Sequence, residues 1–309
     1  MKNRETVHPL FCDPVTGVCE VPGTGTLHHV ADIPASSKKI RVIYFTDPIC
    51  SSCWGIEPQL KKLKLEYGHH LDMEYRMGGL LKSWDSYGGR DVNGPESVAK
   101  HWDEAGAYYE MPIDGDLWLE DPLHSSYPPA IAFKAAQLQG AVKAGKFLRR
   151  IKEMVFLEKK NITRWPHLAD AAVYAGLDVG KFKTDFDGDA VQFFEQDLDL
   201  ARQLGVRGFP SIFFTDEDNN RFLVYGSRSY EHYETALLKL YPDVVKQQYD
   251  QSWENLFKQY STLTTREFAV LANRSTEQAT ELLERLAREE KILRQGTRNG
   301  VLWKAKSLP

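Results

Sequence analysis

The fold is decided by the stretch "RVIYFTDPICSSCWGIEPQLKKLKLEYG" at residues 41–68, in which an apolar run leads into an amphipathic segment. The run, "KIRVIYF" at 39–45, combines β-branched and aromatic residues and predicts a buried strand. A helix is predicted over about 50–67, because apolar side chains recur every three or four positions, at Ile56, Leu60, Leu63 and Tyr67. Pro58 lies inside this helix and should kink it.

The remaining patterns extend this start into a β-α-β order, a helical block and a β-β-α order. "LDMEYRM" at 71–77 alternates and predicts a second strand, which Gly78 and Gly79 end. Helical patterns run from about 95 to 205. "SIFFTD" and "RFLVYG" then predict two strands across the turn "EDNN", and "YEHYETALLKL" predicts a helix after them.

The composition is that of an ordinary globular protein of 309 residues, 42% hydrophobic and 27% charged. A formal net charge of −4 argues against a general binder of nucleic acid or anionic membranes. Residues 1–11 lack the apolar core of a secretory signal and no window is apolar enough to span a membrane, so we expect a cytoplasmic protein. In such a reducing compartment, a close cysteine pair favours catalysis or metal binding over a structural disulfide.

Cys50 and Cys53 form a C-S-S-C pair between the predicted strand and helix. Cys50, at the helix N-terminus, would be the attacking thiolate with an exposed sulfur, and Cys53 the more buried resolving thiol. A zinc site would need two further ligands, and no second CxxC or paired-histidine motif follows downstream. The pattern therefore favours redox chemistry over a metal site or core cysteines.

A proline in "LGVRGFPSIFF" supports this reading from a distant part of the chain. Pro210 opens a strand that we place beside the cysteine pair. A cis bond before it would present the backbone of Phe209 to an extended substrate segment. A proline that simply opens a strand is the alternative, since few X–Pro bonds are cis in folded proteins.

Four stretches together resemble the DsbA-like branch of the thioredoxin superfamily, especially its cytoplasmic, FrnE-type members: "DPICSSCWG", "GGLL", "SSYPPAIAFKAAQLQG" and "ARQLGVRGFPSIFF". The resemblance implies an α/β thioredoxin-like fold with a helical insertion, and an active site made of Cys50, Cys53 and cis-Pro210. It also implies that Pro58 is the family's helix-kinking proline. We expect the substrate to contact Phe209, Ser51, Ser52, Trp54, Gly78, Gly79 and Trp84, with Met77 nearby or in the core.

We divide the chain on this basis. Residues 1–38 form an N-terminal extension, and 39–245 form the DsbA-like domain with its insertion at about 82–205. Residues 246–309 form a C-terminal module.

Two departures from the family pattern concern proton and charge management. Tyr44 stands where thioredoxin-like enzymes often carry a buried acid; Asp47 is the local candidate for that role, with an Asp-Pro turn as the simpler explanation. The Ser51–Ser52 dipeptide brings no cation to the thiolate, so we expect a couple less oxidising than DsbA, which a measured reduction potential can test.

The N-terminal extension holds a second pair, Cys12 and Cys19, across the turn signal "DPVTG". With His28, or with His8 or His29, these thiols could form a zinc site or a second redox site. They could equally be incidental, because C-x₆-C is not a standard ligand spacing. We expect no other cofactor to be required.

The C-terminal module shows two helix patterns with capping-type starts at Thr264 and Ser275, followed by a hairpin around "RNG". This order predicts a winged-helix-like unit. Its second helix, "STEQATELLERLAREEK", is acidic and would repel phosphates, although Arg294, Arg298, Lys304 and Lys306 follow it. A protein partner is therefore favoured over DNA.

Two functions follow. The first is thiol-disulfide exchange on a protein or peptide substrate through Cys50 and Cys53. The second is a non-catalytic adaptor, because "DPICSSCWGIEPQLKKLKLEYG" and "SSYPPAIAFKAAQLQ" also resemble, more loosely, the DsbA-like adaptors that present a stress regulator to the ClpXP protease. A glutathione-dependent isomerase is disfavoured by the presence of Cys53.

Overall fold

The computed structural model describes residues 12–13, 18–20, 40–85 and 94–306. Its central sheet has the strand order β4-β3-β6-β7. These strands are β3 (Ile40–Thr46), β4 (Leu71–Met77), β6 (Ser211–Thr215) and β7 (Arg221–Tyr225). β3 and β4 are parallel, whereas β6 is antiparallel to both β3 and β7. This order and these directions confirm the predicted thioredoxin-like α/β fold.

The predicted helix after β3 is two helices, α1 (Ser51–Gly55) and α2 (Glu57–Tyr67). They meet at Ile56, two residues before Pro58. A proline there has no N–H to donate to the carbonyl of Trp54, so the regular hydrogen-bond ladder is interrupted at this position. The expected kink is therefore a break, and the cysteine pair lies on a short helix of its own.

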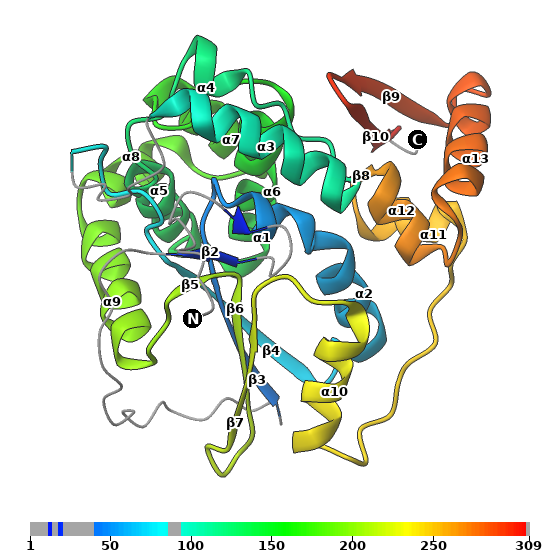
Figure 1. The fold of residues 1–309 in the computed structure, drawn as a ribbon, viewed down its shortest axis with the longest axis horizontal. Coiled ribbons are helices and arrows are strands. Elements are labelled where there is room, and N and C mark those ends of the chain that lie inside the picture. The colour runs from blue at the N-terminus through cyan, green and yellow to red at the C-terminus, as the bar shows by residue number, and fades with distance from the viewer. Residues whose placement is uncertain (1–11, 14–17, 21–39, 86–93, 307–309) are drawn as a thin grey trace, which may run out of the picture.

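The helical block inserted between β4 and β5 covers one side of the sheet (Figure 1). Its members are α3 (Pro95–Tyr109), α4 (Leu117–Glu120), α5 (Tyr127–Gln137), α6 (Ala141–Leu157), α7 (Trp165–Ala175), α8 (Val179–Asp187) and α9 (Asp189–Gln203). Their apolar faces share one core with the sheet and with α10 (Tyr230–Leu240).

A small second sheet lies at the cis-proline strand. It has the order β1-β2-β5, with β1 (Cys12–Asp13), β2 (Val18–Glu20) and β5 (Gly208–Phe209). β2 pairs antiparallel with β5, with Cys19 opposite Phe209 and Glu20 opposite Gly208. Part of the predicted N-terminal extension is thus hydrogen-bonded to the segment that precedes Pro210.

The C-terminal module has its own hydrophobic core. Its elements are α11 (Trp253–Gln259), β8 (Thr262–Thr264), α12 (Thr265–Leu271), α13 (Thr276–Arg288), β9 (Ile292–Thr297) and β10 (Gly300–Ala305). Both expected capping starts are present, as capping boxes at Thr264 and Ser275. The hairpin pairs Thr297 with Gly300 around the predicted turn. The helices and hairpin are as expected; the winged-helix assignment and the domain boundaries stay predictions.

Among the described residues, no helix is both long and apolar enough to cross a membrane.

Candidate active site

Cys50 and Cys53 lie at the point where the central strand gives way to α1. Cys50 is the N-cap of this helix, and the backbone N–H of Cys53 donates a hydrogen bond to Cys50 Sγ at 3.1 Å. Both cysteines are free thiols, and both are fully buried, with 0% of their surface exposed. The expectation of an exposed Cys50 sulfur is therefore wrong for this conformation, because neighbouring chain segments close over it.

The two thiols differ in how readily they ionise. Burial raises the pKa of the Cys50 thiol well above its ordinary value, and hydrogen bonding with Cys53 adds to the rise. Burial also opposes a thiolate on Cys53, but the hydrogen bond with Cys50 and the positive charge of Lys152 outweigh it, so the pKa of Cys53 is lowered. In this closed arrangement the negative charge is favoured on Cys53, the predicted resolving thiol.

Lys152 and Glu57 form a largely buried ion pair, and the positive charge of Lys152 acts on Cys53. Lys152 on α6 is 0% exposed, and its Nζ donates to Glu57 Oε1 at 2.8 Å. Burial alone would lower the pKa of Lys152, but Glu57 and Cys53 together hold it above its ordinary value. Lys152 thus supplies a cation to Cys53, whereas the cation that the Ser-Ser dipeptide lacks was expected to act on Cys50. The sequence signal for it is a lysine on the apolar face of an amphipathic helix, one turn after Leu148.

Asp47 is the buried acid nearest the pair. Its Oδ1 accepts from the N–H of Ile49 at 3.1 Å, and its Oδ2 accepts from the N–H of Leu80 and the hydroxyl of Ser126, both at 2.8 Å. Burial raises the pKa of Asp47 to about 6, against the lowering effect of these bonds. The role of Asp47 therefore goes beyond an Asp-Pro turn: it connects the cysteine loop to the segments of Leu80 and Ser126. Its negative charge also opposes a thiolate on Cys50. Tyr44, in the position of the absent acid, approaches the carbonyl of Cys53 with its hydroxyl at 3.5 Å.

The Phe209–Pro210 peptide bond is cis. The Pro210 carbonyl accepts from the N–H of Gly226 at 2.9 Å, which ties the proline to the end of β7. The ring of Phe209 packs so closely on Gly78 that an added Cβ there would lie 1.8 Å from it. Gly78 is required by this contact, and the backbone edge of β5 on the other side pairs with β2.

Of the expected substrate contacts next to the cysteines, the serines and the tryptophan are buried. Ser52 Oγ is 2.8 Å from the hydroxyl of Tyr109 on α3, and Ser51 is equally inaccessible. The indole N–H of Trp54 donates to the carbonyl of Pro112 at 3.1 Å. In this conformation these side chains join the short helix to the helical block and present no open surface.

The other two expected contacts belong to the same junction. Gly79 has a φ of +67°, which favours glycine, and an added Cβ would lie 2.9 Å from the ring of Tyr127. The half-buried Trp84 donates from its indole N–H to the carbonyl of Leu123 at 2.9 Å and stacks edge-on against Trp118. Their roles in substrate binding stay predictions.

The proposed metal ligands fall on the N-terminal segment. Cys12 and Cys19 are opposite one another in the β1–β2 pair, whereas His28 lies outside the described residues. Among the side chains that the structure describes, no group of three or more His, Cys, Asp or Glu could hold a metal ion. The zinc prediction is therefore neither supported nor contradicted.

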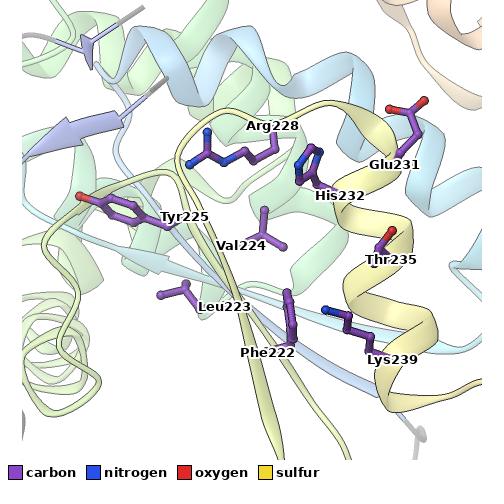
Figure 2. Close-up of a pocket in the computed structure, with 9 residues that line it drawn as sticks. All are labelled: Phe222, Leu223, Val224, Tyr225, Arg228, Glu231, His232, Thr235 and Lys239. Atoms are coloured by element: carbon purple, nitrogen blue, oxygen red, sulfur yellow. The ribbon is translucent and has the colours of Figure 1, made fainter. Parts of the chain in front are cut away.

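Two cavities lie elsewhere in the described part of the chain. One of about 440 Å³ lies between edge strand β7 and α10, and Figure 2 shows Arg228 and His232 at one end of it and Phe222 and Lys239 at the other. The second, of about 1020 Å³, lies between β4, the helical block and the C-terminal module. Neither is lined by the cysteines, which fits a closed site.

Comparison with known proteins gives relatives of two kinds. The thioredoxin family model matches residues 44–235. ClpXP adapter protein SpxH from Halalkalibacterium halodurans is 32% identical over 300 residues, covering 95% of this chain and 96% of that protein. ClpXP adapter protein SpxH from Bacillus subtilis is 30% identical over 275 residues, covering 87% and 90%.

Among solved structures, the cytosolic disulfide reductase DsbM from Pseudomonas aeruginosa superposes with a TM-score of 0.53 and 22% identity. The match covers 65% of this chain and 99% of that one. It shows a shared fold for the thioredoxin-like part.

Proposed function

Since this chain belongs to the thioredoxin family, and within it to the group of the SpxH proteins, we propose that it acts as an adapter for the ClpXP protease. The observation that carries the proposal is the extent of the match: 32% identity through 95% of this chain. A disulfide reductase of the same fold covers only 65%. The added regions are therefore part of what relates this chain to the adapters.

The way the C-terminal module is fixed supports a binding role. Glu267 of α12 is buried, and its carboxylate accepts two hydrogen bonds from Arg149, at 2.7 and 2.9 Å, and one from Lys61 at 2.5 Å. A bidentate, buried pair of this kind holds one orientation. A module locked to the thioredoxin-like domain offers a partner one composite surface.

Charge favours a protein partner over nucleic acid. Three of the four basic residues named after α13 are paired with acids: Arg294 with Glu284 at 2.9 Å, Arg298 with Asp116 at 2.6 Å, and Lys306 with Glu290 at 3.4 Å. Little basic charge is left to meet phosphates. The proposed adapter would work in the cytoplasm on a regulatory protein.

The test has two steps. Protein half-lives are compared in cells with and without this gene, and a protein that becomes longer-lived is purified and incubated with ClpXP. We expect added chain to accelerate its degradation. An unchanged set of half-lives, or equal degradation without the chain, would contradict the adapter role.

A second candidate is thiol-disulfide exchange, favoured by one observation: a CxxC pair at a helix start, with Lys152 behind it. A Cys50 thiolate would attack a substrate disulfide, forming a mixed disulfide and releasing one substrate thiol. The Cys53 thiolate would then attack Cys50 Sγ, leaving a Cys50–Cys53 disulfide and a reduced substrate. The lowered pKa of Cys53 suits this second step.

Cys50→Ser separates the two candidates. The adapter proposal expects ClpXP-dependent degradation to continue at the wild-type rate, while exchange with a disulfide peptide is abolished. If degradation is lost together with exchange, the cellular role depends on catalysis. Cys53→Ala serves as the partner variant, since it should accumulate mixed disulfides that identify a substrate.

A further inference from the structure

The larger cavity, of about 1020 Å³, lies against an open edge of the central sheet, and we call it the β4 cavity. β4 is an edge strand, because it pairs with β3 and with no other strand in the described part of the chain. Residues 72–76 of β4 line the cavity, and the C-terminal module adds residues 257–262 and Ala305. The module lies beyond residues 44–235, which the thioredoxin family model matches. The thioredoxin-like part alone therefore does not enclose the β4 cavity.

The outer edge of β4 has backbone groups to offer. In a parallel pair, every second residue of a strand turns its N–H and C=O toward the neighbouring strand. The N–H of Gly78 donates to β3, so the odd-numbered residues of β4 turn theirs outward, and the Tyr75 carbonyl accepts from Gln137 Nε2 at 3.4 Å. The N–H of Tyr75 and both backbone groups of Met73 face the same way, without a hydrogen-bond partner among the described residues. This is the edge to which a further strand can add.

Exposed apolar side chains line the same cavity. Val142, at the start of α6, is 76% exposed, and Tyr174, at the end of α7, is 50% exposed. Large apolar side chains that stay exposed beside a cavity mark an interaction site. A strand along β4 would place alternate side chains toward such a surface.

The charge of the β4 cavity favours an acidic occupant. Seven basic and three acidic residues line it. Most of these charges are paired within the protein, but Lys146 of α6 and Lys258 of α11 are exposed and have no ion-pair partner among the described residues. Of the acids, Glu57 and Glu74 are paired with cations, which leaves Asp72. The surplus is positive, and it complements a segment that carries carboxylates.

We propose that the β4 cavity binds an extended, acidic segment of the protein that the adapter delivers, its client, and that this segment adds as a strand to the outer edge of β4. Apolar side chains of the segment lie against Val142 and Tyr174, and its carboxylates meet Lys146 and Lys258. The inference rests on the proposed adapter function and names the surface that holds the client.

The first test measures binding of a probe peptide to the full-length chain. The probe is a fluorescein-labelled peptide of alternating valine and glutamate, and the comparison peptide alternates valine and lysine. By fluorescence anisotropy, we expect the acidic peptide to bind at least about tenfold more tightly, with an affinity that falls as salt is added. Equal affinities, or tighter binding of the lysine peptide, would overturn the inference.

Charge reversal in the cavity tests the two unpaired lysines. Lys146→Glu/Lys258→Glu should weaken binding of the acidic peptide at least about tenfold. The matched control, Lys82→Glu/Lys143→Glu, changes the net charge equally at exposed lysines that do not line the cavity. Its affinity should stay within about twofold of wild type. Equal losses in the two variants would reduce the attraction to a general effect of charge and contradict a site in the β4 cavity.

Hydrogen exchange at single-residue resolution tests strand addition. The N–H groups of Met73 and Tyr75 should exchange roughly tenfold more slowly when the acidic peptide is bound. The N–H of Glu74 faces β3 and should keep its rate. Unchanged exchange at Met73 and Tyr75 with the peptide bound would exclude docking along this edge.

A degradation assay separates the inference from the adapter function itself. Excess acidic peptide should slow the ClpXP degradation of the client found in the half-life comparison, while a ClpXP substrate that needs no adapter is degraded as before. Binding of the peptide without slower degradation would overturn the inference and leave the adapter function standing. If the wild-type chain accelerates no degradation, the adapter function fails, and the client role of the β4 cavity fails with it.

Discussion

A buried carboxylate so close to two thiols makes Asp47 the most informative single residue of the site. It is 0% exposed, it receives hydrogen bonds from three segments, and its pKa is raised from 3.8 to about 6. Its ionised form therefore destabilises the fold near neutral pH. Because the charge of Asp47 raises the pKa of Cys50, protonation of Asp47 is coupled to ionisation of the Cys50 thiol.

Asp47→Asn should reveal that property as a pH-dependent gain in stability. Because the folded pKa is raised, the wild type binds the extra proton in the folded state and loses stability as pH rises from about 4 through 6. Between pH 4 and pH 7 the stability of the variant relative to the wild type should improve by roughly 2 kcal/mol. Urea denaturation at the two pH values measures it, and a constant difference between the proteins would contradict the raised pKa.

At the scale of elements, the local patterns were predictable and the long-range contacts were not. The strands at 39–45 and 71–77, the hairpin after Pro210 and both capping boxes follow from periodicity and turn chemistry within a few residues. The β1–β2–β5 sheet has no such signal, because strands of two or three residues show no alternation.

The same limit applies to the site. The cysteine pair and Pro210 can be recognised from sequence motifs. The buried cation of the site cannot, because Lys152 and its partner Glu57 are 95 positions apart in the sequence. The burial of Cys50 depends on packing that no local pattern encodes. The sequence therefore predicts a cysteine pair and its proline as a redox site, but it does not predict the closed state in which they lie.

The helix α13 offers a test of whether its amphipathic face supports the C-terminal module. Leu283 is 0% exposed in the core of the module, whereas its neighbour Leu282 is only partly buried. Leu283→Ala should lower the free energy of unfolding by about 2–5 kcal/mol through the cavity it leaves. Leu282→Ala is the control and should have a smaller effect. Guanidinium denaturation compares them, and equal losses would mean that the packing of α13 differs from this structure.

For the molecule as a whole, a chain of buried and partly buried charges connects the cysteine pair to the C-terminal module. Lys152 contacts Glu57, Glu57 contacts Lys61 at 3.3 Å, and Lys61 contacts Glu267 in α12. The Glu267 carboxylate stays ionised, since burial is outweighed by Arg149 and Lys61 and its pKa is lowered to about 2. The module and the site thus share one electrostatic network.

Glu267→Gln should break this network by removing the carboxylate that Arg149 and Lys61 share, so that Arg149 keeps only Glu153 and Lys61 only Glu57. Loss of one partner of a buried pair typically destabilises by about 3–5 kcal/mol. We expect the module to unfold before the thioredoxin-like domain, with faster hydrogen exchange at residues 262–306. Arg298→Ala removes the ion pairs of an exposed arginine with Asp103, Asp114 and Asp116 and should change stability by less than about 1 kcal/mol. Similar effects of both variants would contradict a special role for the buried pair.

The tip of the C-terminal hairpin makes the two backbone hydrogen bonds that a neighbouring strand would make to Ile113. The side chain of Asn299 accepts from the N–H of Ile113 at 3.0 Å and donates to its carbonyl at 2.7 Å. The preceding residue, Pro112, receives the indole N–H of Trp54, one position after Cys53. A chimera whose C-terminal module comes from another protein would lose these hydrogen bonds, unless residues 111–114 are replaced together with the module.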